Sequence, residues 1–410
     1  MTTIVTEEYV GVRHDVEAVA PVSPGGTRVV SVDIFRGLNM LLMIFVNNIS
    51  EVTGLPWWTY HRGDVNGMTY VDMVFPGFLF LMGMAIPLAI DGRIARGESR
   101  AKIAWHLIVR SVSLLAMGLF IANARNVDPR ATHMTQTWWT VLGFIAIAMT
   151  WVQLPGEAQR KVLHRILHYV GLAMLGTLFV LFRKVGPGGQ IATLDFSYVE
   201  ILGLLAWAYL LVGSVYLIFP KRFEFVTGAF ALMVAMNVFS TLGWLKWMPG
   251  WIPFEAGLSS MTMAGVLASM VIVGDGIASH FKQKAMWIAS GVAILLALGF
   301  VLEPLGISKN HDTPAWCLYC TAANLAIALV LYWIADVKRW QAWANFAKPA
   351  GENPLLAYLL HYVPFLVVPL IWFSAIGTSG AFGVFKSVLA TGVVLLITAV
   401  LVHWKVKLRV

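Results

Sequence analysis

The sequence predicts an all-α protein that crosses a membrane many times. Of its 410 residues, 59% are hydrophobic and only 12% are charged, whereas a soluble domain carries about 25% charged residues. Mean hydropathy is +0.75. Only helices and closed barrels satisfy their backbone groups in lipid. The apolar runs have the length of helices, because a bilayer core takes about 20 helical residues. We therefore expect a polytopic helical bundle.

About 10–12 spans are expected, since twelve apolar segments are candidates. In order, they are 31–49, 70–90, 103–123, 136–153, 163–182, 199–219, 224–240, 257–275, 285–302, 314–335, 354–374 and 382–403. The segment 224–240 is short for a span. Residues 1–29 are polar and lack the apolar core of a signal peptide, so we expect a flexible cytoplasmic tail. Residues 30–410 are expected to form a single transmembrane domain.

Basic residues predict the orientation. Lys and Arg gather in alternate connections, for example at 93–102, 160–165, 221–222 and 282–284, and again after the last span. Because cytoplasmic loops carry the excess of Lys and Arg, we expect both termini in the cytoplasm. The expected location is the inner (plasma) membrane of a bacterium. The basic residues are scattered over short loops, so nucleic acid is not an expected partner.

The two cysteines do not indicate a metal site. Cys317 and Cys320 have C-x-x-C spacing inside an apolar segment. A structural zinc site takes four ligands, and the sequence has no second pair of cysteines. We expect two buried thiols, because a free cysteine packs as a small hydrophobe.

Polar residues concentrate at the predicted outer end of the bundle. Asn47 and Asn48 end the first span, His61 lies in the loop 50–69, and Asp72 begins the second span. A second outer loop, 303–313, contributes Lys309, Asn310 and His311. Ionisable groups at the depth of a membrane are costly and are usually functional. Four polar elements on one face therefore predict a site there.

Several of these segments together resemble one family. They are SVDIFRGL, MIFVNN, NGMTYVDMVFPGFLFLMGMAIPLAI and VRSVSLLAMGLF within residues 29–123, with GISKNHDTPAWCLYC at 306–320 and GENPLLAYLLH at 351–361 as weaker matches. The chain is similar to the transmembrane acyltransferases related to heparan-α-glucosaminide N-acetyltransferase. It looks like a bacterial-type homologue without the luminal domain. A Trp usual in the histidine loop and a Leu-Gln-Arg motif after the third span are missing.

The resemblance implies an acetyltransferase that works across the membrane. Acetyl-CoA is the implied cytosolic donor, and an amino sugar or another glycan group outside is the acceptor. N-acetyl transfer is expected, with O-acetyl transfer an alternative. His61 is the implied catalytic histidine, as a base or as a carrier of the acetyl group. Asn47 would stabilise an oxyanion, or cap its helix. Asp72 would orient His61, or cap the second span. Relatives suggest a homodimer.

The remaining candidates have structural alternatives. Arg110 would contact a phosphate of coenzyme A, or snorkel to the interface. Asn353 and His361 lie on one apolar helix and are candidates for the same cofactor pocket. Lys309, Asn310 and His311 would bind the acceptor or form a solvated loop. Trp57 and Trp58 would stack on a sugar or belong to the aromatic belt. Asp33 and Arg36, one turn apart, are expected to form an ion pair.

Two other functions remain open on the sequence alone. Twelve spans with polar residues also suit a secondary transporter of a small polar solute. Transporters show internal repeats and helices broken near the midplane, and no repeat is visible here. A non-catalytic membrane receptor would tolerate substitution of His61 and Asn47 without loss of an acetyl-transfer activity.

Overall fold

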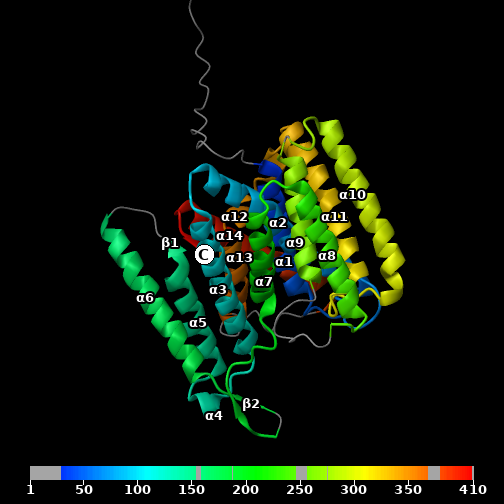
Figure 1. Cartoon of the computed structure of the whole chain (residues 1–410). Coiled ribbons are helices and arrows are strands. Elements are labelled where there is room, and N and C mark those ends of the chain that lie inside the picture. The colour runs from blue at the N-terminus through cyan, green and yellow to red at the C-terminus, as the bar shows by residue number, and fades with distance from the viewer. Residues whose placement is uncertain are drawn as a thin grey trace, which may run out of the picture.

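A computed structural model describes residues 29–153, 158–186, 188–245, 256–274, 276–367 and 379–408. The chain is helical with almost no sheet, so the predicted fold class is confirmed (Figure 1). The expected N-terminal tail lies outside the described residues, apart from Val29. The rest of the chain forms a helical bundle with short connections.

The long helices appear in the order expected from the apolar segments. They are α1 (Val30–Ile49), α2 (Val74–Ala95), α3 (Arg100–Ala124), α5 (Gln136–Trp151), α6 (Ala158–Leu181), α7 (Glu200–Ile218), α8 (Phe223–Thr241), α9 (Gly257–Ile272), α10 (Phe281–Leu302), α11 (Pro314–Tyr332), α13 (Pro354–Val367) and α14 (Gly380–His403). Two short helices are α4 (Pro129–Thr132) and α12 (Lys348–Glu352). Single turns are η1 (Trp57–Thr59), η2 (Tyr70–Met73), η3 (Glu303–Leu305), η4 (Trp333–Val337) and η5 (Ala342–Ala344).

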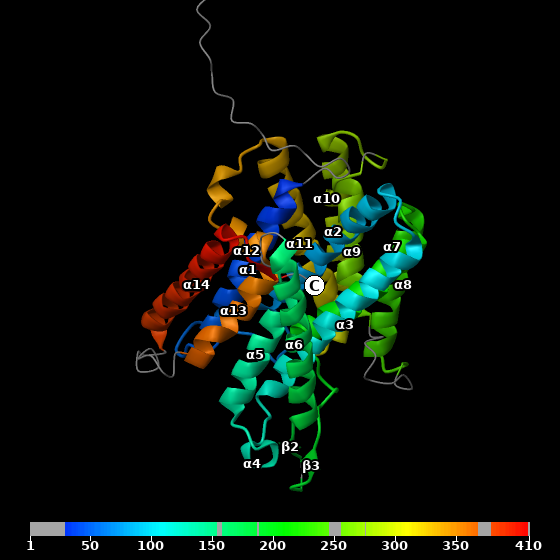
Figure 2. The ribbon, with the colours of Figure 1, turned by 90° about the vertical axis from the view of Figure 1, so that its left-hand side faces the viewer.

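Four two-residue strands complete the described structure. Strand β1 (Val152–Gln153) pairs antiparallel with β4 (Lys407–Leu408). Strand β2 (Lys184–Val185) pairs antiparallel with β3 (Ile191–Ala192). The β2–β3 hairpin projects beyond the bundle at the end of the α5–α6 pair (Figure 2). The β1–β4 pair fastens the C-terminus to the end of α5.

Nine helices in the described part of the chain have the length and apolar character needed to cross a membrane. Every expected span coincides with a helix, and the short segment 224–240 lies in one of the nine, α8. Two expected spans are shorter helices than predicted, since α5 and α9 have 16 residues each. Helix α13 has 14 described residues. Residues 368–378 of the expected span 354–374 are outside the described residues.

Small residues allow two helix pairs at the centre to approach closely. A Cβ atom on Gly83 of α2 would overlap the carbonyl oxygen of Thr262 in α9, and one on Gly265 of α9 would overlap the carbonyl oxygen of Phe80. Gly118 of α3 has the same relation to the backbone before α7. Small residues at crossings are typical of membrane helices, because lipid supplies no hydrophobic drive between them.

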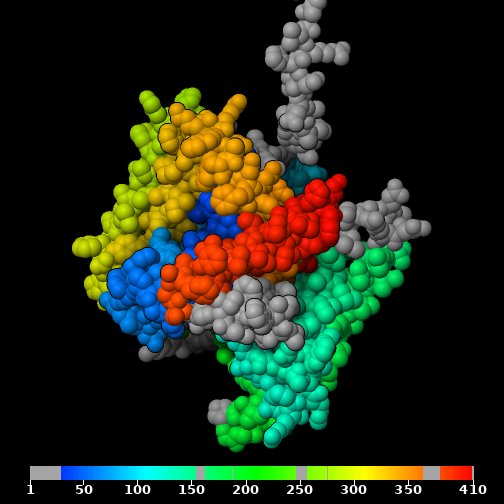
Figure 3. All heavy atoms as spheres, turned by 180° about the vertical axis from the view of Figure 1, so that it is seen from behind, coloured from blue at the N-terminus to red at the C-terminus, as the bar shows by residue number. Residues whose placement is uncertain are grey.

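The outer helices present apolar side chains to their surroundings. In α6, α8, α10 and α14, only 17% of the most apolar window is buried within the protein. Helix α14 lies across the back of the molecule as a ridge (Figure 3). These helices are therefore placed to face lipid, while α1, α2, α9 and α11 form the interior.

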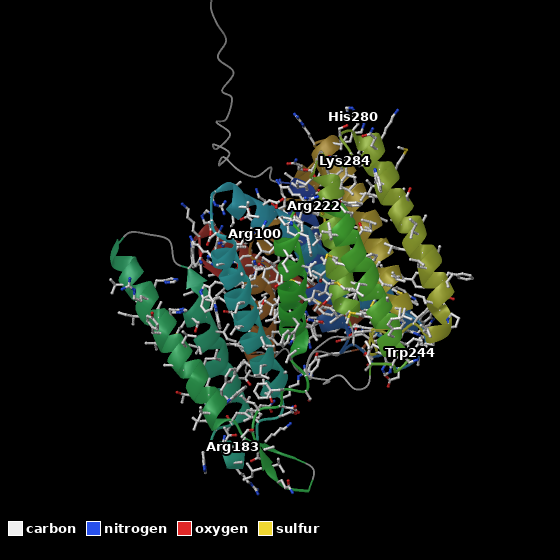
Figure 4. All side chains as sticks on the ribbon, viewed as in Figure 1. Arg100, Arg183, Arg222, Trp244, His280 and Lys284 are labelled. Atoms are coloured by element: carbon white, nitrogen blue, oxygen red, sulfur yellow. The ribbon has the colours of Figure 1, made fainter. Side chains whose placement is uncertain are left out.

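The two ends of the bundle carry different residues. Arg100, Arg222 and Lys284, from three connections predicted to be cytoplasmic, lie at one end, and Arg183 and Trp244 lie at the other (Figure 4). These three basic residues, from connections predicted to lie on the same side of the membrane, therefore lie at the same end of the bundle. We call the end with Arg100 the inner end and the opposite end the outer end. The compartment that each end faces remains a prediction.

Candidate functional site

One face of α1 lines two cavities that follow each other along the helix. Arg36, Met40 and Met43 line the first cavity, and Asn47 lines the second. Their spacing of three or four residues places them on one helical face. We call the first the inner cavity and the second the outer cavity, after the ends of the bundle at which they lie. Ile201 of α7 lines both.

The inner cavity has a volume of about 430 Å³ and a mixed lining. Methionine and leucine side chains from α1, α2, α3 and α7 contribute to its wall, together with Arg36, Arg110 and Glu352. Arg36 pairs with Asp33 as expected, with 3.1 Å between Nη1 and Oδ1. The guanidinium of Arg110 lies 4.9 Å from the ring centre of Tyr209. Arginine donors near an apolar tunnel suit a ligand with phosphates and an apolar arm.

Asn353 also lines the inner cavity, but it has a structural task. It is 1% exposed. Its Nδ2 donates to the carbonyl oxygen of Val406 at 3.3 Å, and its Oδ1 accepts from the backbone N–H of Leu408 at 3.3 Å. Asn353 therefore holds the C-terminal strand β4 against the start of α13.

The outer cavity has a volume of about 500 Å³ and a largely polar lining. Asn47, Arg125, Glu200 and His361 all line it. His361 is 4% exposed, so the structure places it inside the bundle as the sequence predicted. The neighbouring Asn48 is turned away and donates to the carbonyl oxygen of Ile44 at 2.8 Å. Of the two asparagines, Asn47 is therefore the one that reaches a cavity.

A carboxyl group and two phenols stand between the cavities. The Tyr358 hydroxyl donates to Glu200 Oε1 at 2.8 Å, and it lies 2.9 Å from the Tyr362 hydroxyl. Tyr362 donates to Glu200 Oε1 at 3.2 Å. Tyr358 lines the inner cavity, whereas Glu200 and Tyr362 line the outer one. The sequence analysis missed this cluster, although a Glu at the start of an apolar segment and a Tyr pair four residues apart are visible signals.

His61 and Asp72 form a close pair at the outer end of α2. His61 Nδ1 lies 2.7 Å from Asp72 Oδ1, and the Asp72 side chain is 2% exposed. Asp72 Oδ2 accepts from the backbone N–H of Thr69 at 3.0 Å in a capping box at the start of η2. Both interpretations of Asp72 therefore apply, because one oxygen caps the helix and the other meets His61.

Lys309 completes this cluster from the second outer loop. Its Nζ lies 3.4 Å from His61 Nδ1 and 3.5 Å from His61 Nε2. Burial lowers the pKa of Lys309, and the carboxylates of Asp72 and Asp312 oppose that shift. The two outer loops are joined by the backbone N–H of Ile307, which donates to Asn66 Oδ1 at 2.7 Å. The hydrogen bond between the two loops thus helps to hold the Lys309 amine beside His61.

The remaining predicted residues of the outer loops lie at the surface. Asn310 Nδ2 donates to Asp64 Oδ1 at 3.2 Å, and His311 is exposed. Trp57 is 64% exposed, with the Arg62 guanidinium 5.0 Å from its ring centre, and Trp58 is 52% exposed. These exposed side chains belong to the same two outer loops as His61 and Lys309.

Asn47 and His61 lie in different surroundings. Asn47 lines the outer cavity, and the described lining of neither cavity includes His61. Within the described residues, no hydrogen bond joins the two side chains. The outer end therefore has two polar centres, a cavity with Asn47 and His361 and a surface cluster with His61. Cys317 and Cys320 are buried free thiols as expected, and no metal-ligand group occurs among the described residues.

Comparison with known proteins bears on the N-terminal part of the chain. Residues 28–184, which include His61 and Asp72, match the family described as "Domain of unknown function (DUF5009)". Heparan-alpha-glucosaminide N-acetyltransferase of Mus musculus is 39% identical over 92 residues, and that of Homo sapiens is 38% identical over 96 residues. The predicted resemblance to these acetyltransferases is confirmed. The matches cover 22% and 23% of this chain.

The chain spans only 13% and 14% of the length of these two acetyltransferases. It is also 25% identical over 216 residues to undecaprenyl-diphosphatase of Bifidobacterium longum, a match that covers 52% of this chain and 68% of that protein. The sequence identity to the two acetyltransferases is higher than the identity to the diphosphatase, but it extends over fewer residues.

Proposed function

We propose that the protein moves an acetyl group from cytosolic acetyl-CoA to an amino sugar or another glycan acceptor outside a bacterial plasma membrane. The observation that carries this proposal is the 2.7 Å pair of His61 and Asp72, in the region that matches the family. A histidine oriented by a buried carboxylate is a standard base for acyl transfer. Residues 30–410 would act as one transmembrane domain with the loop 50–69 outside.

The inner cavity fits the proposed donor. Arg36 and Arg110 offer guanidinium groups to phosphates, and the methionine and leucine wall suits the arm of the cofactor. Glu352 lines the same cavity, and its negative charge would repel phosphate groups. The phosphates are therefore proposed to lie beside the two arginines and away from Glu352. Asn353 and His361 line the two cavities, so they are proposed contacts of the arm rather than of the nucleotide. When bound, acetyl-CoA supplies the activated thioester.

His61 is the proposed base and Asp72 its positioning residue. With Nδ1–H donating to Asp72, Nε2 carries the lone pair that takes a proton from an attacking amine or hydroxyl. The same nitrogen can instead attack the thioester and hold the acetyl group as acetyl-histidine. Asn47 would donate to the developing oxyanion from the outer cavity, whose described lining does not include His61. The proposed acceptor contacts are Lys309, whose Nζ lies 3.4 Å from His61 Nδ1, and the exposed residues Asn310, His311, Trp57 and Trp58 of the same two outer loops.

Purified protein in nanodiscs tests the proposal through thiol release from acetyl-CoA in the presence of glucosamine. The variants are His61→Ala, Asp72→Asn and the control His106→Ala, which removes an exposed histidine of α3. We expect acceptor-dependent release that falls by about 10²–10⁴-fold in His61→Ala and stays unchanged in the control. Asp72→Asn should lose most activity. The single amide oxygen would accept from the Thr69 N–H, so the amide nitrogen would face His61 as a donor instead of an acceptor.

Two outcomes would contradict the proposal. A His61→Ala protein with the activity of the control would remove His61 from the chemistry. A folded wild-type protein that binds no acetyl-CoA would remove the donor assignment and favour a transporter. An acid-quenched protein that carries a labelled acetyl group on His61 would select the two-step route over direct transfer.

A further inference from the structure

We propose that Lys309 is a site of self-acetylation, where the lysine amine accepts the acetyl group in place of an external acceptor. The product would be N-acetyl-lysine, an amide that stays on the protein. The proposal rests on the proposed function, because His61 must first act on the acetyl donor. It assigns a covalent modification to the second outer loop.

The first support is the position of the Lys309 amine. Its Nζ lies 3.4 Å from His61 Nδ1 and 3.5 Å from His61 Nε2. Because these two distances are nearly equal, the amine is in line with the lone pair of neither nitrogen. Nδ1 is already held by Asp72 at 2.7 Å, which leaves Nε2 for the acetyl chemistry. Reacting groups about 3–3.5 Å apart are close to an attack geometry, so Lys309 is placed to compete for the acetyl group.

The second support is the environment of this amine. Burial lowers the pKa of Lys309, while the carboxylates of Asp72 and Asp312 oppose the shift. Among the described residues, no carboxylate oxygen lies within the 4.0 Å of an ion pair with Lys309 Nζ. Only a neutral lysine amine is a nucleophile, and removal from water increases the neutral fraction. Lys309 is therefore better suited to attack an acyl carbon than a fully solvated lysine is.

Hydrogen bonds fix the backbone immediately before Lys309. The backbone N–H of Ile307 donates to Asn66 Oδ1 at 2.7 Å, which joins the two outer loops. The backbone N–H of Ser308 donates to Thr313 Oγ1 at 2.9 Å, and both of these residues are buried. The lysine side chain therefore begins from a fixed point next to the loop that carries the histidine.

The reaction balances by either route proposed for His61. In direct transfer, Nζ attacks the thioester carbon, the carbon–sulfur bond breaks, and His61 takes the proton from Nζ and returns it to the thiolate. In two-step transfer, Nζ attacks the acetyl carbon on Nε2, the bond from that carbon to Nε2 breaks, and the imidazole keeps the proton. One acetyl-CoA gives one acetyl-lysine and one free thiol, so no further reactant is needed.

Lys184 is an internal comparison at the same end of the bundle. It lies in β2, next to Arg183 at the outer end (Figure 4). Its Nζ pairs with Asp195 Oδ2 at 2.6 Å. The carboxylate favours the charged amine, which cannot attack an acyl carbon. We therefore expect Lys184 to report the slow background acetylation by acetyl-CoA.

Peptide mass spectrometry of full-length protein in nanodiscs tests the proposal. The protein is incubated with isotope-labelled acetyl-CoA without an acceptor, and the label is counted at Lys309 and Lys184. We expect Lys309 to gain label at least about tenfold faster than Lys184, because orientation beside the acyl group contributes more than that factor. In His61→Ala the Lys309 rate should fall to the Lys184 rate, whereas the exposed control His106→Ala should leave both rates unchanged.

His61→Gln, which keeps a polar side chain, covers the case in which His61→Ala fails to fold. The proposal is overturned if wild type labels Lys309 no faster than Lys184, or if a folded His61 variant labels Lys309 as wild type does.

Its failure can be told from a failure of the proposed function. Glucosamine-dependent thiol release by a protein whose Lys309 stays unlabelled would leave the transferase standing and remove this site. His61-dependent label on Lys309 without thiol release to glucosamine or a glucosamine-terminated oligosaccharide would keep the site and remove the proposed acceptor.

Discussion

Lys309 is an amine held close to a histidine and partly removed from water. Its Nζ is 3.5 Å from His61 Nε2, and burial lowers its pKa despite the two nearby carboxylates. The buried Asp72 carboxylate meets His61 at 2.7 Å and interacts electrostatically with Lys309. At the residue scale, burial therefore works against the Lys309 charge while the two carboxylates support it.

The lowered pKa of Lys309 predicts how stability depends on pH. A lysine with a lower pKa in the folded state than in the unfolded state disfavours folding while it is protonated. This cost is present at pH 7 and disappears as the pH rises toward 10.5, its ordinary pKa. Lys309→Met should therefore raise the free energy of unfolding at pH 7 by up to about 1 kcal/mol after solvent screening, and raise the thermal midpoint with it. The gain should shrink as the pH approaches 10.5.

Thermal unfolding in detergent between pH 7 and pH 10.5 measures this difference. Lys282→Met, at an exposed position of α10, is the control and should show a smaller effect of either sign. A Lys309→Met protein that is less stable than wild type at pH 7 would show that the Lys309 charge is favourable in the folded state.

At the scale of elements, the close crossing of α2 and α9 fixes the interior. Both helices carry a glycine where the other backbone passes, Gly83 and Gly265. Packing of this kind depends on the absence of a side chain rather than on a contact made by one.

Gly83→Ala should therefore destabilise the protein although alanine favours helices. The added Cβ would overlap the backbone of Thr262 and Gly265, and overpacking of this kind costs about 1–3 kcal/mol. Gly176→Ala is the matched control, since Gly176 of α6 has open space around it. The control should be neutral or stabilising by up to about 1 kcal/mol. Thermal midpoints of the two variants in one detergent give the comparison, and equal midpoints would remove the crossing as a constraint.

The elements also show what the sequence could predict. Apolar length located all twelve long helices, because hydropathy is a local property of the chain. The Asp33–Arg36 pair and the Asp72 cap were predictable, since their partners are three residues away in sequence. The Glu200 cluster was not, because its partners come from α13, 158 and 162 residues later. The cavities were missed for the same reason, as six helices contribute to the described wall of the inner cavity and five to that of the outer one.

The molecule holds a mixed and a largely polar cavity in its interior and presents apolar helices at its surface. Helices α6, α8, α10 and α14 form much of that surface. The two ends differ in their basic residues, with Arg100, Arg222 and Lys284 at the inner end (Figure 4). A membrane would fit between these ends. The proposed direction of transfer depends on which end faces the cytoplasm.

Single-cysteine labelling decides the orientation. Both native cysteines are buried, so they should add little background. Asn310→Cys at the outer end should react with a membrane-impermeant maleimide in intact cells. Ser279→Cys at the inner end should react only after the cells are opened. Both positions are exposed, so the reverse pattern would invert the protein and with it the proposed path of the acetyl group.

The partition of Tyr358, Glu200 and Tyr362 has a consequence for the cell's energy supply. A membrane that stores a proton gradient tolerates few continuous aqueous paths. Two cavities in line along α1 would come close to such a path if they were joined. With two phenols and a carboxyl between them, the proposed transfer would pass an acyl group between the compartments while the ions on either side stay where they are. The protein would thus exchange chemistry between compartments without discharging the membrane.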